Sequence, residues 1–306
     1  MSAQYPEPEE TGHVPVQGGK IWYRINGRRQ LDAGRTPLLC LHGGPGCSHD
    51  YLLLLTLLAE RRPVILYDQL DCGQSDRPGR RENWTVEHFV DEIDAVRRHL
   101  DLPEVAIFGS SCGGTWVASY AVRRPPGLKA VVLASPFLSA AVYMRDAERL
   151  RNSLPADIRD TLTRHEEAGT TQSESYGRAV TYWHEQFICR TLPWPRCVQR
   201  MIALWNADLY GYMWGPSEAK CTGTLKNFDL TPELAKIDAP TWYVCGEFDE
   251  ITPQSVTEFS KLTPGSRLDV IAGASHMPHI EKQDEFMRLA HDFLDANLNR
   301  HGAGAA

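Results

Sequence analysis

The sequence predicts a doubly wound α/β fold, in which helices cover both faces of a mainly parallel sheet. Short, almost continuously apolar runs recur along the chain, as expected for strands that are buried on both faces. Amphipathic helical segments separate these runs, and strands that alternate with helices form parallel crossovers. The 306 residues are enough to bury the core of one large domain with an insertion.

The predicted elements begin with a β-hairpin at 14–25, where two alternating runs flank a pair of glycines. Buried strands are predicted at 37–42, 63–68, 104–109 and 129–135 and, after a long interruption, at 241–247 and 266–273. The clearest helix is predicted at 85–100, because its apolar residues fall on one face and Thr85 can serve as its N-cap. A last amphipathic helix is expected at about 283–298.

The interruption, residues 137–230, is predicted to be an inserted helical domain. It contains amphipathic helical stretches and four of the eight tryptophans, which are Trp183, Trp194, Trp205 and Trp214. We therefore expect a core domain formed by 1–136 and 231–306 and a helical cap domain formed by 137–230.

Composition argues against several classes of partner. The formal net charge is −7 and no basic stripe is visible, so neither nucleic acid nor an anionic membrane surface is an expected partner. The eight cysteines lack paired zinc-site spacings and are expected to be free thiols in a reducing compartment. The first twelve residues are polar and acidic, unlike a signal peptide, and the apolar run at 51–59 is too short to span a bilayer. These features predict a cytoplasmic protein.

The segment FGSSCGG, residues 108–114, offers three candidate nucleophiles in a row: Ser110, Ser111 and Cys112. A serine at a strand-to-helix elbow has a strained backbone, so the residues two before and two after it must be small. Only Ser111 has glycine at both positions. Ser111 is therefore the predicted nucleophile, and the backbone N–H of Cys112 is expected to face the developing oxyanion. A Gly/Ser-rich turn and a cysteine hydrolase that uses Cys112 are the alternatives.

A serine nucleophile in such an elbow needs a carboxylate and a histidine, which follow it in the order Ser, Asp, His. Asp249 follows one predicted strand and His276 follows the next, at the sheet edge where ligands of parallel sheets bind. Glu247 and Glu250 are alternatives to Asp249 as the carboxylate. Because unperturbed imidazole titrates near pH 6.5, a base at His276 predicts activity that rises through about pH 6 to 7.

The loop HGGPG at 42–46 is the expected source of the second oxyanion donor. Glycine lets a backbone N–H approach the substrate oxygen, with Gly44 as the first choice and Gly43 as the second. A phosphate-binding loop is the alternative, but neither GxxxxGK[ST] nor GxGxxG is present. No HExxH motif accompanies His276 and His279, so neither a metal nor another cofactor is expected.

These motifs resemble those of the α/β-hydrolase fold prolyl aminopeptidases, or proline iminopeptidases, which include the tricorn-interacting aminopeptidase. The resemblance rests on HGGPGCSHDYL at 42–52, YDQLDCGQSDRP at 67–78, GSSCGG at 109–114, GEFDEITP at 246–253 and the GASH segment after them. It implies an α/β-hydrolase fold with an eight-stranded, mostly parallel sheet, an inserted helical cap and the triad Ser111, Asp249 and His276. It also implies a serine aminopeptidase that removes an N-terminal proline or small apolar residue from short peptides through an aminoacyl-serine intermediate.

The resemblance further implies a site for the free amino group of the substrate. In that family two glutamates bind the amine, one in a cap motif similar to MWGPSE at 213–218 and one just before the catalytic aspartate. The matching residues are Glu218 and Glu247. An ammonium group buried under a cap requires compensating carboxylates, so this assignment is physically reasonable.

The chain departs from the family pattern at four positions. Asp71 and Cys112 replace a usual glycine and a usual aromatic residue, and Trp214 and Ser217 stand where polar amides are common. The last three are expected to border the pocket and to alter substrate preference. An amino-acid amide or ester hydrolase, a tailoring hydrolase for an aminoacyl metabolite and a non-catalytic receptor are the alternative functions, and the sequence specifies no oligomeric state.

Overall fold

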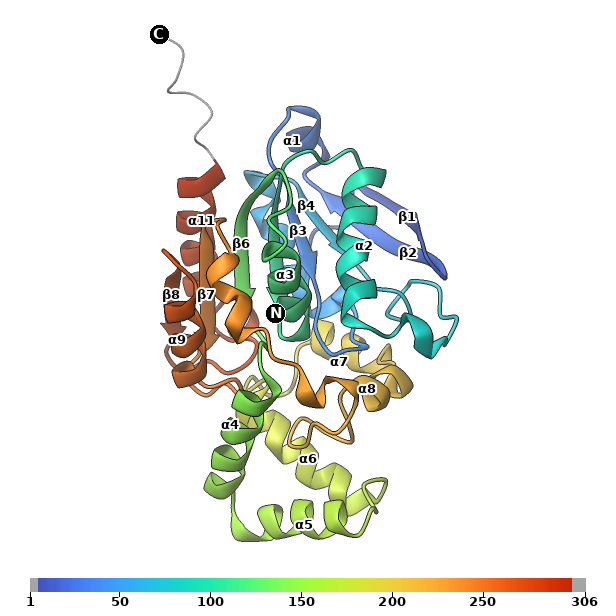
Figure 1. Cartoon of the computed structure of the whole chain (residues 1–306), viewed down its shortest axis with the longest axis vertical. Helices are drawn as coiled ribbons and strands as arrows, with labels where there is room; N and C mark the ends of the chain where they lie inside the picture. Colours follow the sequence, from blue (N-terminus) through green and yellow to red (C-terminus); the bar gives the residue numbers. More distant parts are fainter. Residues whose placement is uncertain (1–4, 299–306) are drawn as a thin grey trace.

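The computed structural model describes residues 5–298, which form an eight-stranded sheet flanked by helices (Figure 1). The strands are β1 (Glu10–Val16), β2 (Gly19–Asn26), β3 (Leu38–Leu41), β4 (Val64–Tyr67), β5 (Val105–Ser110), β6 (Leu128–Ala134), β7 (Thr241–Gly246) and β8 (Arg267–Ile271). Their order in the sheet is β1-β2-β4-β3-β5-β6-β7-β8. Only the pairs β1–β2 and β2–β4 are antiparallel, which confirms the predicted mostly parallel sheet.

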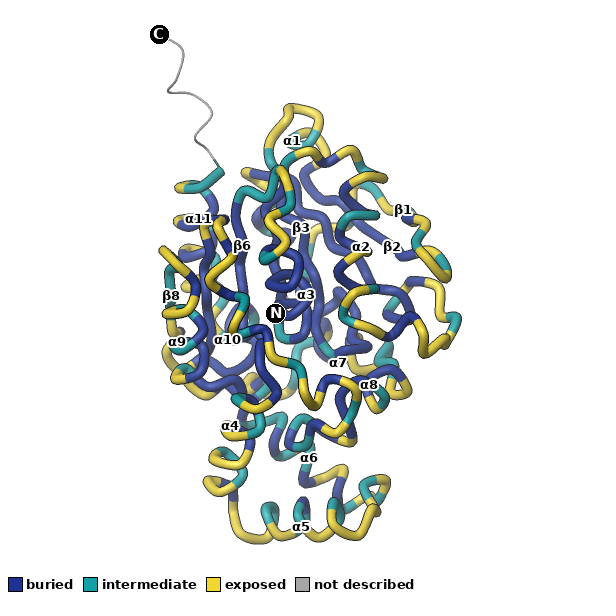
Figure 2. The backbone as a smooth tube through the Cα atoms, viewed as in Figure 1, coloured by how far each residue is buried: buried dark blue, intermediate teal, exposed yellow. Residues whose placement is uncertain are grey.

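Two separate apolar cores lie on the two faces of the sheet. Alternate residues of β3 and β4 enter different cores, so that Leu39 and Ile65 pack in one and Leu38 and Val64 in the other. The first core is covered by α2 (Val86–His99), α3 (Cys112–Ala121) and α9 (Pro253–Leu262), and the second by η1 (His49–Glu60) and α11 (Gln283–Leu298). The central strands are buried throughout (Figure 2), which explains why they read as continuous apolar runs.

Three short elements belong to the core outside the inserted segment. They are α1 (Arg28–Asp32), η2 (Arg81–Asn83) and α10 (Pro278–Glu281).

The N-cap predicted for α2 is confirmed: the side chain of Thr85 accepts a hydrogen bond from the backbone N–H of His88. None of the helices in the described part of the chain is long and apolar enough to cross a membrane.

The long interruption between β6 and β7 is helical. It contains α4 (Ala140–Ser153), α5 (Ala156–Glu167), α6 (Glu174–Phe187), α7 (Arg196–Ala203), α8 (Ala207–Met213), η3 (Thr224–Asn227) and η4 (Thr231–Lys236). In Figure 1 these helices gather at one end of the sheet, with α5 farthest from it. Residues of this segment and of the core line one cavity, which is described below. The division into a core domain and a cap domain stays a prediction, and residues 1–4 and 299–306 of the predicted core domain lie outside the described residues.

The connection from β5 to α3 is too crowded for side chains at its glycines. A Cβ atom at Gly109 would clash with the carbonyl oxygen of Gly113, and one at Gly113 would lie 2.5 Å from the carbonyl oxygen of Leu41. Ser111, between the two glycines, has a φ of 56°, a conformation that L-residues rarely adopt. The glycine spacing seen in the sequence therefore reflects direct steric contact between strand, helix and the neighbouring strand β3.

Replacing Gly113 by alanine is expected to lower the free energy of unfolding by about 2 kcal/mol, because the added methyl group overpacks the elbow. Gly177→Ala in α6 is the matched control, since no heavy atom lies within 4 Å of a Cβ there. Alanine has the higher helix propensity, so this control should be neutral or stabilising by up to about 1 kcal/mol. Urea unfolding of both variants measures the difference. Equal stabilities would show that the elbow is not sterically constrained.

Candidate active site

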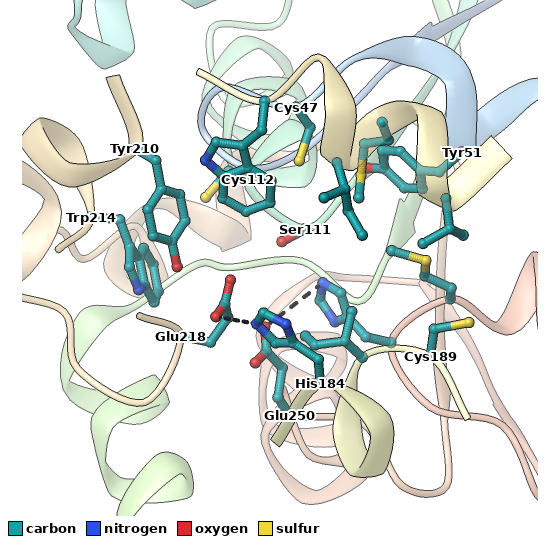
Figure 3. Close-up of a pocket in the computed structure, with 18 of the residues that line it drawn as sticks. Cys47, Tyr51, Ser111, Cys112, His184, Cys189, Tyr210, Trp214, Glu218 and Glu250 are labelled. Carbon is teal, nitrogen blue, oxygen red and sulfur yellow. Dashed lines mark hydrogen bonds and ion pairs between the residues drawn. The ribbon is translucent and has the colours of Figure 1, made fainter. Parts of the chain in front are cut away.

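Ser111 is fixed in the elbow by backbone hydrogen bonds on both sides. Its N–H donates to the carbonyl of Ala134 at 3.0 Å, and its carbonyl accepts from the N–H groups of Gly114 and Phe137 at 2.9 and 3.2 Å. The side chain lies at the wall of the cavity between the core and the inserted helices (Figure 3). A strained, anchored serine that faces a cavity has the geometry that a nucleophile requires.

His276 and Asp249 form a buried pair behind the same cavity. Nδ1 of His276 lies 2.8 Å from Oδ1 of Asp249, which also accepts from the N–H of Ile251 at 3.0 Å. His276 lines the cavity together with Ser111. A carboxylate at Nδ1 favours the tautomer that leaves Nε2 free to accept a proton, so this arrangement can activate the serine.

Ser135 is a site residue that the sequence reasoning missed. Its Oγ donates to Oδ2 of Asp249 and so fixes the second carboxylate oxygen. Ser135 directly follows β6 and is fully buried, with a φ of 48°. Its position as the last residue of the strand predicted at 129–135, at the edge that carries Asp249 and His276, was the signal that could have identified it.

The loop that contains Gly43 and Gly44 lies directly against Ser111. A Cβ at Gly43 would lie 2.7 Å from the Cβ of Ser111. The N–H of Gly43 donates to the hydroxyl of Tyr51 at 2.7 Å, whereas Gly44 lines the cavity. The structure therefore favours Gly44 over Gly43 as an oxyanion donor.

Cys112 is the first residue of α3, where a backbone N–H has no acceptor within the helix. This N–H and the positive end of the helix dipole can both stabilise an oxyanion at Ser111. The thiol of Cys112 is completely buried, and burial raises its pKa well above the ordinary value. A thiol that resists ionisation is a poor nucleophile, which argues against the cysteine-hydrolase alternative.

Two carboxylates, those of Glu218 and Glu250, line the cavity beside Ser111 (Figure 3). Glu218 comes from the inserted segment, and its Oε2 lies 2.6 Å from Nε2 of His184 on α6. Glu250 comes from the turn after β7, and its Oε2 accepts from the indole N–H of Trp183 at 3.1 Å. The core and the inserted helices thus each contribute one acidic group.

Glu247, the second glutamate expected from the sequence, is not part of this arrangement. Its side chain is exposed, and its Oε2 accepts from the N–H of Gly273 at 2.9 Å, outside the cavity. Glu250 occupies the position expected for Glu247, and its Oε1 lies 3.9 Å from Nε2 of His276. The assignment of Glu247 is therefore corrected to Glu250, because the turn after β7 directs the later residue into the cavity and the earlier one toward the loop after β8.

The two glutamates titrate in opposite directions. Burial raises the pKa of Glu250 to about 7; the charge of His276 opposes this shift, and the charge of Glu218 adds to it. Burial also opposes ionisation of Glu218, but the charge and hydrogen bond of His184 outweigh it and lower the pKa of Glu218 to about 2. At neutral pH the cavity therefore contains one fully ionised carboxylate and one that a bound cation can ionise completely.

The departures from the family pattern have different consequences. The ring of Trp214 lines the cavity, while Ser217 bonds to the hydroxyl of Tyr176 at 2.7 Å and does not line it. The carboxylate of Asp71 accepts from the indole N–H of Trp84 and the backbone N–H of Gly79, both at 2.8 Å. Asp71 therefore fixes the fold of its loop.

No group of three or more His, Cys, Asp or Glu side chains within residues 5–298 is arranged to hold a metal ion. His279, considered with His276 in the sequence, is fully buried with Nε2 2.9 Å from the carbonyl of Tyr51.

Comparisons with known proteins agree with this geometry. The family model described as alpha/beta hydrolase fold matches residues 36–283. The proline iminopeptidase of Heyndrickxia coagulans is 42% identical over 286 residues, which cover 93% of this chain and 98% of that protein. The proline iminopeptidase of Thermoplasma volcanium is 34% identical over 292 residues, which cover 94% of this chain and 98% of that protein.

Two solved structures are similar over nearly the whole chain. The crystal structure of VinJ has a TM-score of 0.91 and 37% identity, and covers 95% of this chain and 100% of its own. That of the proline iminopeptidase of Mycobacterium smegmatis has a TM-score of 0.84 and 33% identity, and covers 94% of this chain and 98% of its own.

The reaction of Ser111 with a fluorophosphonate is expected to accelerate with pH up to about pH 9. Burial opposes protonation of His276, but the charge and hydrogen bond of Asp249 outweigh it and raise the pKa of His276 to about 9. The basic form, which alone activates Ser111, therefore accumulates as the pH rises toward 9, above the range of 6 to 7 expected from unperturbed imidazole. Labelling rates between pH 6 and pH 10 measure this increase of the rate with pH. A rate already constant above pH 7 would contradict the raised pKa.

Proposed function

Because the chain belongs to the alpha/beta hydrolase fold family and, within it, to the proline iminopeptidases, we propose that it removes an N-terminal residue, preferably proline or a small apolar residue, from short aminoacyl substrates such as peptides. The observation that carries this proposal is the presence of Glu218 and Glu250 in the cavity of Ser111. Two buried carboxylates beside a nucleophile match a substrate with a free ammonium group next to its reactive carbonyl.

The reaction follows from the positions of the triad. The Oγ of Ser111 attacks the carbonyl carbon while Nε2 of His276 takes its proton, and Asp249 holds the imidazole in the required orientation. The N–H groups of Gly44 and Cys112 stabilise the oxyanion. The carbon–nitrogen bond breaks, and His276 donates its proton to the leaving amine. Water, deprotonated by His276, then attacks the aminoacyl ester, so that the free amino acid leaves and Ser111 is restored.

Aromatic side chains give the amine-binding part of the cavity its shape. The ring of Trp214 contacts the rings of Phe137 and Tyr143, with centroids 4.9 and 4.8 Å apart, and all three line the cavity. These rings form an apolar wall next to Glu218 and Glu250, and such a wall suits a pyrrolidine ring or another small apolar side chain. Large or charged N-terminal side chains would lose this contact.

Selectivity for the N-terminus follows from charge. The ammonium group of the substrate would place a positive charge beside Glu218 and Glu250, where burial raises the pKa of Glu250 and a second cation would favour its ionised form. An N-acylated substrate has no such charge and would bury an amide against ionised carboxylates. An amino-acid amide or ester hydrolase, or a tailoring hydrolase for an aminoacyl metabolite, would use the same residues. The uncharged side chains of Cys189, Val198, Met201 and Met277 in the same cavity favour this second candidate.

Glu218→Gln and Glu250→Gln are each expected to lower kcat/KM on a free prolyl arylamide by about 10- to 100-fold, because each removes a charge-assisted hydrogen bond to the ammonium. Steady-state rates on the free and N-acetylated substrates measure the effect. The wild type should cleave the free substrate much faster, and this preference should decrease in both variants.

Glu247→Gln is the matched control, since its carboxylate lies outside the cavity. Its kcat/KM should stay within about twofold of the wild type, as is usual for exposed substitutions. Equal rates of the wild type on free and N-acetylated substrates would refute the role of the carboxylates. A loss of activity in Glu247→Gln, with Glu250→Gln unaffected, would restore the original assignment.

A further inference from the structure

The cavity has two parts that differ in chemistry. The acidic lobe contains Glu218 and Glu250 together with the rings of Phe137, Tyr143 and Trp214. These three rings pack in the first apolar core. The apolar lobe contains Cys47, Tyr51, Cys189, Val198, Met201 and Met277, all of which pack in the second core. In Figure 3, Tyr51 and Cys189 lie across the cavity from Glu218 and Trp214, with Ser111 between them.

The apolar lobe has almost no free polar groups for a ligand. None of the six residues that define it is charged, and burial raises the pKa of Cys189 to about 12, so its thiol stays neutral. The hydroxyl of Tyr51 already accepts the N–H of Gly43, and the carbonyl of Cys189 accepts the indole N–H of Trp194 at 3.0 Å. A peptide backbone placed there would leave N–H and carbonyl groups without partners, whereas a hydrocarbon chain would only gain burial.

Position assigns this lobe to the leaving group. If the ammonium lies at Glu218 and Glu250 and the carbonyl carbon at Ser111, the bond that breaks points away from the acidic lobe. His276, which must donate a proton to the leaving nitrogen, is followed directly by Met277 in the wall of the apolar lobe. Nε2 of His276 also lies 3.9 Å from Oε1 of Glu250, so His276 stands between the two lobes. With the ammonium held in the acidic lobe, the apolar lobe is the side of His276 that remains for the leaving amine.

The apolar surface continues outward at the rim. Val198 and Met201 of α7 face the lobe, and Ile202 beside them is 41% exposed. Ile202, Trp194 and Trp205 also line a groove on the outside of the inserted helices, and this groove includes Glu218 and His184 as well. The indole rings and Ile202 therefore provide an apolar side to this groove, against which a chain longer than the lobe can lie.

We propose that the apolar lobe binds the leaving group and that the preferred substrates are amides of a free amino acid with a hydrophobic amine, rather than peptides with a polar second residue. This inference rests on the proposed function, because it takes the ammonium position from Glu218 and Glu250. The reaction remains hydrolysis: the carbon–nitrogen bond breaks, the amine takes a proton from His276, and water supplies the hydroxyl group of the released amino acid.

The test compares prolyl ethyl-, butyl-, hexyl- and octylamide with prolyl-glycyl-glycine. The four alkylamides have leaving groups of equal intrinsic reactivity, so differences among them report binding in the lobe. We expect kcat/KM to rise about threefold per methylene until the lobe is full. The octylamide should exceed the peptide, although its amine is the poorer leaving group.

Met201→Gln places an amide in the apolar lobe and should flatten the dependence on chain length. Met287→Gln is the matched control, because Met287 packs at the edge of the second core without lining the cavity, and it should leave the dependence unchanged. If Met201→Gln does not fold, the wild-type series alone decides.

Two results would overturn the inference. Cleavage of prolyl-glycyl-glycine at or above the octylamide rate, with no dependence on chain length, would refute the inference and leave the proposed function intact. Failure to cleave any free-amine substrate, while Ser111 still reacts with a fluorophosphonate, would refute both.

Discussion

The arrangement of the cavity depends on two carboxylates that lie beside Ser111, Glu250 buried and Glu218 largely so. Burial raises the pKa of Glu250 to about 7, and Glu218 stays ionised because His184 pairs with it. Such a cavity gains from a bound cation, and an ammonium group can satisfy both carboxylates at once. The inserted segment brings Glu218 to a core that provides Glu250, Ser111, Asp249 and His276, so neither part alone contains all of these residues.

Asn206 joins the inserted helices to the loops around the nucleophile. Its backbone N–H donates to the carbonyl of Gly46 at 2.9 Å, and its amide donates to the carbonyl of Asp71 at 2.8 Å. Its side-chain oxygen also caps α8 by accepting the N–H of Leu209. One residue therefore positions the helix that precedes Trp214 relative to the loop of Gly44.

The sequence predicted features that depend on local patterns and missed those that depend on how distant segments meet. The strands were predictable because burial on both faces leaves continuous apolar runs, and Ser111 was predictable because its glycines relieve a local steric conflict. Glu247 and Glu250 stand three residues apart, and only the packing of the turn against the loop after β8 decides which enters the cavity. The hydrogen bond of Ser135 and the raised pKa of His276 likewise depend on tertiary contacts with Asp249.

The most direct test of the account measures the binding of prolinamide to the Ser111→Ala variant by calorimetry between pH 5.5 and pH 8. The affinity should increase as the pH rises through about 7, because Glu250 loses its proton and attracts the ammonium more strongly. N-acetylprolinamide should bind weakly at every pH. Equal affinities for the two ligands, or an affinity for prolinamide that does not change with pH, would contradict the claim that buried carboxylates select the N-terminus.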